Sequence, residues 1–160
     1  MLKFLLDLIK MFFKTKSQKP NEIVTEETPE AIEKSEEKPV YKYGSASLRR
    51  IAECHPDLQI IAHELIKVMD VSVICGYRGE KEQNEAFDKG FSRLRYPQGK
   101  HNQKPSLAID IVPYPVNWND IDRFEIMCSE VERIAKERGI KIRLGRDFKT
   151  LKDYPHIELV

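Results

Sequence analysis

The sequence predicts an α+β fold, a small antiparallel sheet flanked by helices, preceded by an amphipathic N-terminal helix and a flexible linker. Segments with helical periodicity come first along the folded part, and strands mixed with helices follow them. The connections after Gly139 and Pro155 are short, which suits antiparallel strands better than repeated βαβ units. A length of 160 residues leaves room for one ordinary domain, and no internal repeat is visible.

Residues 1–16 have the pattern of an amphipathic helix. Lys3, Asp7, Lys10 and Lys14 recur at steps of four, three and four, which puts the charges on one face and Leu and Phe residues on the other. The stretch is too short and too charged to span a bilayer, and it lacks the cleavage site of a secretory signal. Two interpretations stay open: a helix lying in a membrane interface, or a helix that docks on the domain or on a partner.

Residues 17–40 are predicted to form a flexible, charged linker. The stretch has few large apolar side chains, and it cannot bury enough surface to offset the entropy of ordering. Prolines and many glutamates dominate it: Glu22, Glu26, Glu27, Glu30, Glu33, Glu36 and Glu37. The folded domain is therefore predicted to span residues 41–160.

The first half of this domain contains two helices, a strand and a third helix. Ser45 or Ser47 can cap a helix that runs to Cys54. The second helix follows His55, with Pro56 and Asp57 in its first turn. Its apolar stripe consists of Leu58, Ile61, Leu65 and Val68. A strand at 71–75 is then followed by a helix at 80–89 that ends before a glycine.

The second half contains the long loop 91–105, whose length favours a functional role. A strand at 107–112 follows, and two prolines stop it. A long amphipathic helix at 119–138 is closed by Gly139, and the last strand candidates are 140–144 and 157–160.

Composition excludes some classes of protein. The chain has 27 basic and 26 acidic side chains, so it lacks the basic excess of a nucleic-acid binder. Cys54, Cys75 and Cys128 are far apart and form no CxxC pair, which argues against a zinc ribbon or a redox motif. We expect all three thiols to be reduced and buried, rather than part of an oxidised extracellular scaffold.

Asp110 is the most informative residue, because it lies in an otherwise apolar strand. An unpaired buried carboxylate costs several kcal/mol, so a cation must compensate it, either an arginine or a metal. Of the four histidines, His55 and His63 lie in helical contexts that suggest structural roles, whereas His101 is in the long polar loop and His156 opens the last strand. Two histidines and one carboxylate make a normal catalytic zinc shell.

Three segments, in this order, resemble the M15 zinc metallopeptidases, which include D-Ala-D-Ala carboxypeptidases and phage-type L-alanyl-D-glutamate endopeptidases (endolysins). The resemblance covers roughly residues 45–160, and the flanking segments His55-Pro56-Asp57-Leu58 and 145–149 look phage-type. The segments are Cys75-Gly76-Tyr77-Arg78, then Lys100-His101-Asn102 with Pro105-Ser106-Leu107-Ala108-Ile109-Asp110, and finally Asp153-Tyr154-Pro155-His156-Ile157-Glu158-Leu159.

The resemblance implies one Zn²⁺ per chain, held by His101, Asp110 and His156. It also implies that Asp153 is the general base and that Arg78 binds a substrate oxygen. The alternatives to these catalytic roles are structural: a turn-forming role for Asp153 and a surface ion pair of Arg78 with Glu80 or Glu82. Three aromatic residues could line the cleft, although aromatic residues more often belong to a core: Tyr77, Tyr114 and Trp118.

The sequence departs from the family pattern at a few positions. Eight residues separate His101 from Asp110 where six are commonest, Ser106 stands where glycine is usual, and Gly99 where serine often precedes the histidine. Gly145-Arg146-Asp147 replaces the more usual Gly-Gly-Asp, which we expect to alter the rim of the cleft.

The function expected from the resemblance is hydrolysis of the L-alanyl-D-glutamate bond in peptidoglycan stem peptides. A D-alanyl-D-alanine carboxypeptidase is the alternative enzyme, and a non-catalytic, metal-dependent wall-binding module is the alternative from another class. The protein is expected to be a monomer that acts at the bacterial cell wall. It is expected to lack a cleavable signal peptide and to bind no nucleic acid. Membrane association through residues 1–16, or synthesis in a host cytoplasm if phage-encoded, would set where it is found.

Overall fold

The computed structural model describes residues 39–150 and 152–160. The predicted N-terminal helix and nearly all of the predicted linker lie outside these residues, so both stay predictions. Among the described residues, no helix has the length and apolar character needed to cross a membrane.

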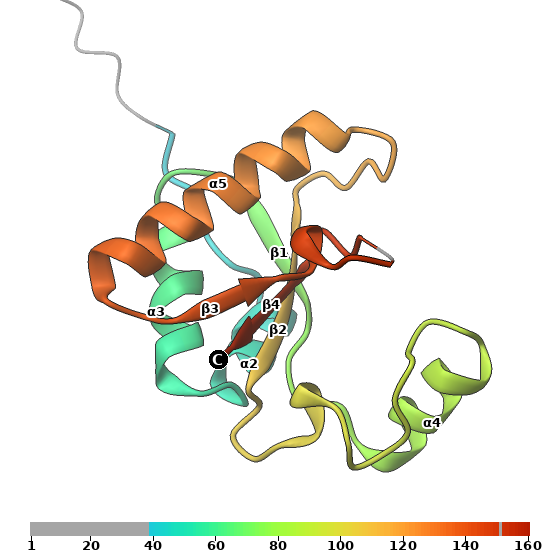
Figure 1. Cartoon of the computed structure of the whole chain (residues 1–160). Helices are drawn as coiled ribbons and strands as arrows, with labels where there is room; N and C mark the ends of the chain where they lie inside the picture. The colour runs from blue at the N-terminus through green and yellow to red at the C-terminus, as the bar shows by residue number, and fades with distance from the viewer. Residues whose placement is uncertain (1–38, 151) are drawn as a thin grey trace, which may run out of the picture. The chain divides into compact units, whose positions relative to one another are not determined.

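A four-stranded antiparallel sheet forms the centre of the domain, as the sequence predicted. Its strands are β1 (Val71–Cys75), β2 (Ala108–Pro113), β3 (Ile142–Leu144) and β4 (His156–Leu159). They lie in the order β1-β2-β4-β3, and every neighbouring pair is antiparallel (Figure 1). The last strand of the chain is therefore inserted between two earlier ones, which brings β4 directly beside β2.

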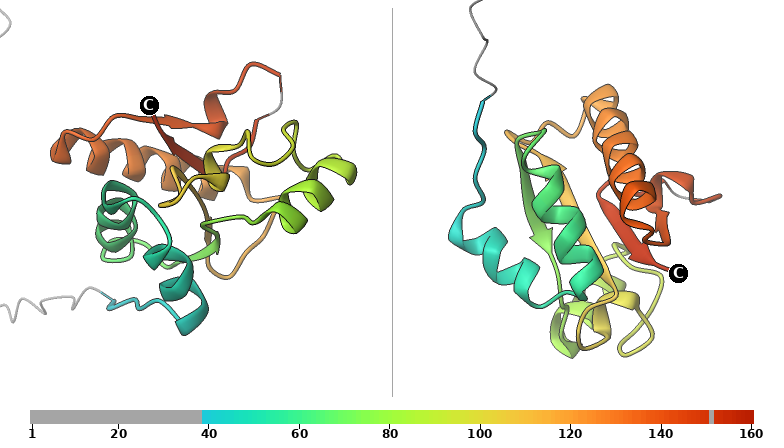
Figure 2. Two further views of the ribbon diagram at one scale, coloured as in Figure 1. Left: turned by 90° about the horizontal axis from the view of Figure 1, so that it is seen from below. Right: turned by 90° about the vertical axis from the view of Figure 1, so that its left-hand side faces the viewer.

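The helices are α2 (Ser45–Ala52), α3 (Pro56–Leu65), α4 (Glu80–Asp88) and α5 (Ile121–Arg138). Helices α3 and α5 contact each other, and α5 also contacts β2, whereas α4 lies apart from them (Figures 1 and 2). The core between these helices and the sheet is apolar and includes Leu58, Ile61, Leu65, Ile109, Ile111, Phe124, Met127, Val131 and Ile157. Because the core uses one side of the sheet, the polar residues of β2 and β4 remain available on the other.

Local chemistry at the helix ends confirms most of the predicted boundaries. His55 precedes α3, and its Nδ1 accepts a hydrogen bond from the Asp57 N–H at 3.3 Å. Gly139 closes α5 in the left-handed region, at φ 66°. The predicted serine cap of α2 is wrong, because Gly44 occupies that position without a side-chain bond. Ser47 instead accepts a hydrogen bond from the Val73 N–H at 3.1 Å, which ties α2 to β1.

Two predicted burials are also wrong. Val68 is 51% exposed, because α3 ends at Leu65 and the stripe does not continue past it. Cys75 is only partly buried, because it ends β1 beyond a register shift between Val73 and Cys75. All three cysteines are free, as expected, and Cys54 and Cys128 are buried.

Candidate active site

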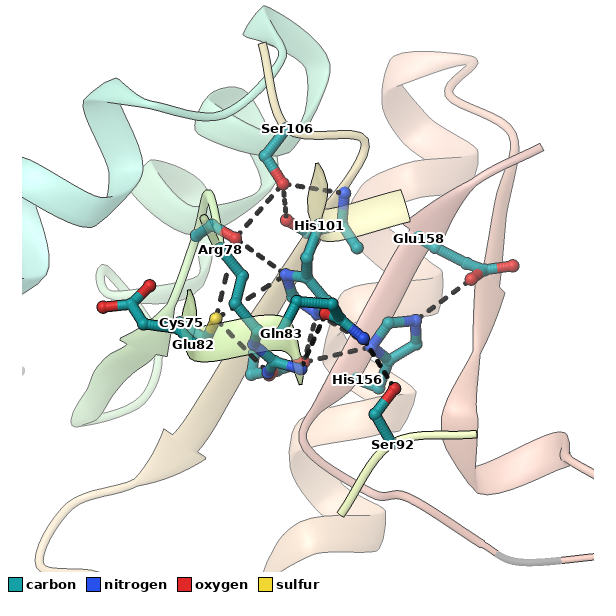
Figure 3. A network of polar contacts seen from close by, with 12 residues as sticks. Cys75, Arg78, Glu82, Gln83, Ser92, His101, Ser106, His156 and Glu158 are labelled. Atoms are coloured by element: carbon teal, nitrogen blue, oxygen red, sulfur yellow. Dashed lines mark hydrogen bonds and ion pairs between the residues drawn. The ribbon is translucent and has the colours of Figure 1, made fainter. Parts of the chain in front are cut away.

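Three side chains from distant parts of the chain meet on the open side of the sheet, and Figure 3 shows two of them, His101 and His156, pointing toward each other. Asp110 on β2 and His156 on β4 are paired in register, and His101 comes from the short 3-10 helix η1 (Lys100–Asn102). Asp110 Oδ1 lies 3.1 Å from His101 Nε2 and 3.1 Å from His156 Nδ1. The two ring nitrogens are 3.2 Å apart. The three atoms therefore form a nearly equilateral triangle, called the donor triangle below.

Hydrogen bonds between η1, the loop before α4 and α4 itself hold His101 in place. The Arg78 N–H donates to the His101 carbonyl at 2.9 Å, and Asn102 Nδ2 donates to the Arg78 carbonyl at 2.8 Å. Asn102 Nδ2 also lies 3.3 Å from Oε1 of Gln83, which is buried in α4. At Gly99 a Cβ would lie only 2.8 Å from Asn102 Oδ1, so a larger residue there would have to displace the Asn102 side chain, which accepts a hydrogen bond from the Gly99 N–H at 2.9 Å.

Each histidine has its second ring nitrogen bonded to an oxygen outside the triangle. His101 Nδ1 lies 2.7 Å from the Gly76 carbonyl oxygen, and His156 Nε2 lies 3.0 Å from Glu158 Oε2. A carbonyl and an ionised carboxylate can only accept, so the protons belong on these two nitrogens. When the two imidazoles are neutral, the lone pairs of His101 Nε2 and His156 Nδ1 therefore face the triangle, as metal-binding histidines require.

The electrostatics of the triangle favour positive charge. Burial alone lowers the pKa of His101, but the Asp110 carboxylate outweighs it and raises that pKa to about 10. Burial likewise lowers the pKa of His156, while hydrogen bonds to Asp110 and Glu158 raise it to about 9. Burial raises the pKa of Asp110, but the two imidazoles hold it well below its usual range. A proton or a metal ion is thus attracted to the same place.

The donor triangle fits a zinc ion. Zinc bonds of about 2.0–2.1 Å in a tetrahedron separate the donor atoms by roughly 3.3 Å, close to the observed edges of 3.1 and 3.2 Å. A second possible group shares two of these residues, because donor atoms of Cys75, His101 and Asp110 lie within 4.8 Å of one another. The described residues thus contain a Cys/His/Asp group and a His/Asp/His group that could hold a metal.

Arg78 points into the site rather than to the surface acids of α4. Its Nη2 lies 3.4 Å from Asp110 Oδ2 and 3.4 Å from Cys75 Sγ, and its Nη1 lies 3.5 Å from Gln83 Oε1. Within the described residues it forms no ion pair with Glu80 or Glu82. All three contacts are long, so the guanidinium keeps donor capacity for another acceptor.

A cavity of about 910 Å³ opens above the triangle. Its walls come from the loop after α4 and from the segment between η2 (Gly145–Asp147) and β4. Arg93 Nη1 on the first loop donates to Thr150 Oγ1 on the second at 2.8 Å. Asp153 lines the same cavity, and partial burial together with the Asp110 carboxylate raises its pKa.

The backbone around Asp153 is closely fitted. The Asp153 N–H donates to the Gly145 carbonyl at 2.9 Å, and the His156 N–H donates to the Asp153 carbonyl at 3.0 Å. A Cβ on Gly145 would lie 2.2 Å from the Asp153 carbonyl oxygen. Only glycine permits this approach, which folds Asp153 back over the start of β4.

Comparison with known proteins identifies the family. A family profile described as phage L-alanyl-D-glutamate peptidase matches residues 39–160. The chain belongs to this family. The L-alanyl-D-glutamate peptidase of Escherichia phage T5 is 30% identical over 119 residues, covering 71% of this chain and 86% of the phage protein.

Two bacterial relatives agree with this assignment to the phage L-alanyl-D-glutamate peptidase family. The peptidoglycan L-alanyl-D-glutamate endopeptidase CwlK of Bacillus subtilis (strain 168) is 30% identical over 109 residues, which cover 59% of this chain and 63% of CwlK. The crystal structure of the Serratia marcescens L-Ala D-Glu endopeptidase ChiX superimposes with a TM-score of 0.65 at 29% identity, covering 75% of this chain and 91% of ChiX. The resemblance found in the sequence motifs is therefore confirmed at the level of family.

The three aromatic residues predicted to bind substrate do not line the cavity. The ring of Tyr77 lies under Lys104 Nζ at 4.6 Å, Trp118 stacks on the buried Phe124 with ring centroids 5.8 Å apart, and Tyr114 is exposed. The aromatic residues that do line it are Phe91 and Phe148. The Phe148 ring centroid is 5.6 Å from that of His156, so this ring packs against one of the three residues of the triangle.

Sequence reasoning missed the residues that orient the histidines. Glu158 could have been found, because it lies two residues after His156 on a strand and so faces the same side of the sheet. The bond to the Gly76 carbonyl could not be predicted in this way, because every residue has a main-chain carbonyl and the sequence does not show which one accepts. Gly76 itself is constrained, because a Cβ there would lie 2.3 Å from the Arg50 carbonyl oxygen.

Proposed function

We propose that this chain is a zinc peptidase that hydrolyses the L-alanyl-D-glutamate bond of peptidoglycan stem peptides at the bacterial cell wall. The observation that carries the proposal is the donor triangle, whose two histidines each direct a lone pair to the same point beneath an open cavity. Membership of the phage L-alanyl-D-glutamate peptidase family supports the choice of bond. The protein acts as a monomer with one zinc ion.

His101, Asp110 and His156 are the proposed ligands, in preference to the group that contains Cys75. Cys75 Sγ lies 3.7 Å from His101 Nδ1, the nitrogen that already donates to the Gly76 carbonyl. A metal shared by His101 and Cys75 on that side would have to replace this hydrogen bond. The opposite nitrogen, Nε2, has a free lone pair and faces both Asp110 and His156.

Zinc, when bound, supplies a Lewis acid that activates water and polarises the scissile carbonyl. Asp153, in the cavity wall, takes the proton of the attacking water and delivers it to the departing amine of D-glutamate, so that it ends the reaction in its starting state. Its raised pKa suits both halves of this transfer. Arg78 donates hydrogen bonds to the carbonyl oxygen as negative charge develops there.

Charge in the cavity supports a D-glutamyl substrate. Among the described residues, Arg93, Lys100 and Lys149 line the cavity without forming an ion pair with a carboxylate. D-glutamate has two carboxyl groups, and whichever one continues the stem, the other remains free beside the scissile bond. An unpaired cation in the wall offers that carboxylate a partner.

Digestion of purified peptidoglycan followed by mass spectrometry tests the proposal. We expect new N-terminal D-glutamyl stems and glycan-linked L-alanine, and no reaction after zinc removal. Release of free D-alanine would instead assign a D-alanyl-D-alanine carboxypeptidase. Binding to the wall without any cleavage, by zinc-loaded protein, would assign a non-catalytic module.

A further inference from the structure

Arg146 has three carboxylate partners although it lies on the short turn η2. Its Nη2 is 2.6 Å from Glu132 Oε1, its Nη1 is 3.3 Å from Glu125 Oε2, and its Nε is 3.3 Å from Asp147 Oδ1. The Arg146 side chain is only 15% exposed, whereas the side chains of Glu125 and Glu132 are about half exposed. The guanidinium therefore docks η2 onto α5.

The other end of the segment that contains Asp153 is bound to the same helix. The Tyr154 hydroxyl donates to Glu125 Oε1 at 3.0 Å, and Cys128 Sγ lies 3.6 Å from the Tyr154 carbonyl oxygen. Glu125 thus receives Arg146 on one oxygen and Tyr154 on the other. One carboxylate of α5 joins the residues on both sides of Asp153, while the Asp153 N–H is itself bonded to the Gly145 carbonyl.

The arrangement is specific to one face of α5. Glu125 and Glu132 are seven residues apart, two helical turns, and so project from the same side. Glu130 and Glu137 lie on another face, where both pair with Arg133, 44% exposed, within the helix itself. The helix therefore carries two kinds of ion pair: those that hold the Asp153 segment, and those that contact only their own helix.

We propose that Arg146 is a positioning residue, which acts with Glu125 and Tyr154 to hold Asp153 over the donor triangle. The proposal rests on the role of Asp153 as proton carrier given above. Arg146 itself does not touch the substrate. Its contribution is to the geometry of proton transfer, where a displacement of about 1 Å can cost roughly 100-fold in rate.

The test compares Arg146→Gly, Glu125→Gln and Tyr154→Phe with the matched control Glu130→Gln. Each full-length variant is loaded with zinc and assayed on a soluble stem peptide, with zinc content and melting temperature measured in parallel. We expect kcat to fall about tenfold or more in the first three, with KM and zinc content unchanged. Arg146→Lys should restore part of kcat, and Glu130→Gln should match wild type.

Asp153→Asn, in the same assay, separates this inference from the proposed function. If Asp153→Asn retains full turnover, Asp153 is not the proton carrier and the proposed mechanism fails. If Asp153→Asn is inactive while Glu125→Gln and Tyr154→Phe keep wild-type kcat, the positioning role is overturned. A lower melting temperature with unchanged kcat in the folded fraction would likewise reduce Arg146 to a purely structural residue.

Discussion

Asp110 and His156 stand opposite each other in the antiparallel register of β2 and β4, with Oδ1 and Nδ1 3.1 Å apart. Side chains alternate between faces along a strand, so a slip of one residue would turn one of them into the core. The site therefore forms only when the sheet has its native register, and zinc should stabilise that register.

Zinc affinity should rise with pH. In the metal-free protein the pKa of His101 is raised to about 10 and that of His156 to about 9, so protons occupy the triangle at neutral pH. Zinc must displace both of them to bind both histidines, which makes its affinity increase by up to about a hundredfold per pH unit below these values. Competition with a chromogenic chelator between pH 6 and pH 8 measures this slope. A flat profile would contradict the assignment of these histidines as ligands.

Glu158→Gln should weaken zinc binding without unfolding the protein. Glu158 is 5% exposed, and its two oxygens contact His156 Nε2 at 3.0 Å and Arg143 Nε at 2.8 Å. An amide keeps the shape but is a poorer acceptor, and loss of such a partner costs about 10–100-fold in metal affinity. Isothermal titration with zinc gives the affinity, and circular dichroism checks the fold. Equal affinity would show that Glu158 does not orient His156.

Arg78→Ala should reduce catalysis more than stability. The guanidinium makes only contacts of 3.4–3.5 Å, so its removal costs the fold little. A donor to the developing oxyanion can be worth about 100-fold or more in kcat. Steady-state kinetics and thermal melting of Arg78→Ala beside Arg78→Lys separate the two effects. Wild-type kcat in Arg78→Ala would remove Arg78 from the mechanism.

Amidation of the free D-glutamyl carboxylate should raise KM. The amide is neutral and gains less from Arg93, Lys100 and Lys149 than a carboxylate does. Two synthetic stem peptides that differ only in this group provide the comparison, and we expect about a tenfold difference in kcat/KM. Equal kcat/KM for both peptides would show that the cavity cations do not bind this carboxylate.

Residues 1–16 should direct the enzyme to a membrane surface without affecting its chemistry. The sequence places lysines on one face and Leu and Phe on the other, and such helices bind anionic lipid reversibly. A chain that begins at Tyr41 should hydrolyse soluble stem peptides like the full chain, while only the full chain should sediment with anionic vesicles. Loss of hydrolysis in the shortened chain would assign the helix to the domain instead.

The strands and helices were predictable because their signals are local. A run of apolar residues stopped by prolines marked β2, a proline and an aspartate marked the start of α3, and Gly139 marked the end of α5. His101, Asp110 and His156 were singled out from a buried carboxylate in an apolar strand together with ordered motifs. The structure brings these three residues together.

The remaining features depend on contacts between distant segments. The bond from the Val73 N–H to Ser47, rather than a helix cap, required α2 to lie against β1. The exposure of Trp118 and Tyr114 likewise follows from the path of the loop after β2, which does not enter the cavity wall. Arg146 docks on α5 through Glu132 and Glu125, which lie 14 and 21 positions before it in the sequence. No local sequence pattern therefore predicts this contact.

The two histidines are oriented by partners of different kinds: a main-chain carbonyl for His101 and a side chain for His156. This difference determines which of the two partners a substitution can remove during evolution. The Gly76 carbonyl that orients His101 belongs to the main chain, so substitution cannot delete it while the fold persists. Glu158, which orients His156, is a side chain that a single codon change can replace. Variation in metal affinity among descendants of this sequence should therefore accumulate on the β4 side, with the η1 side held constant.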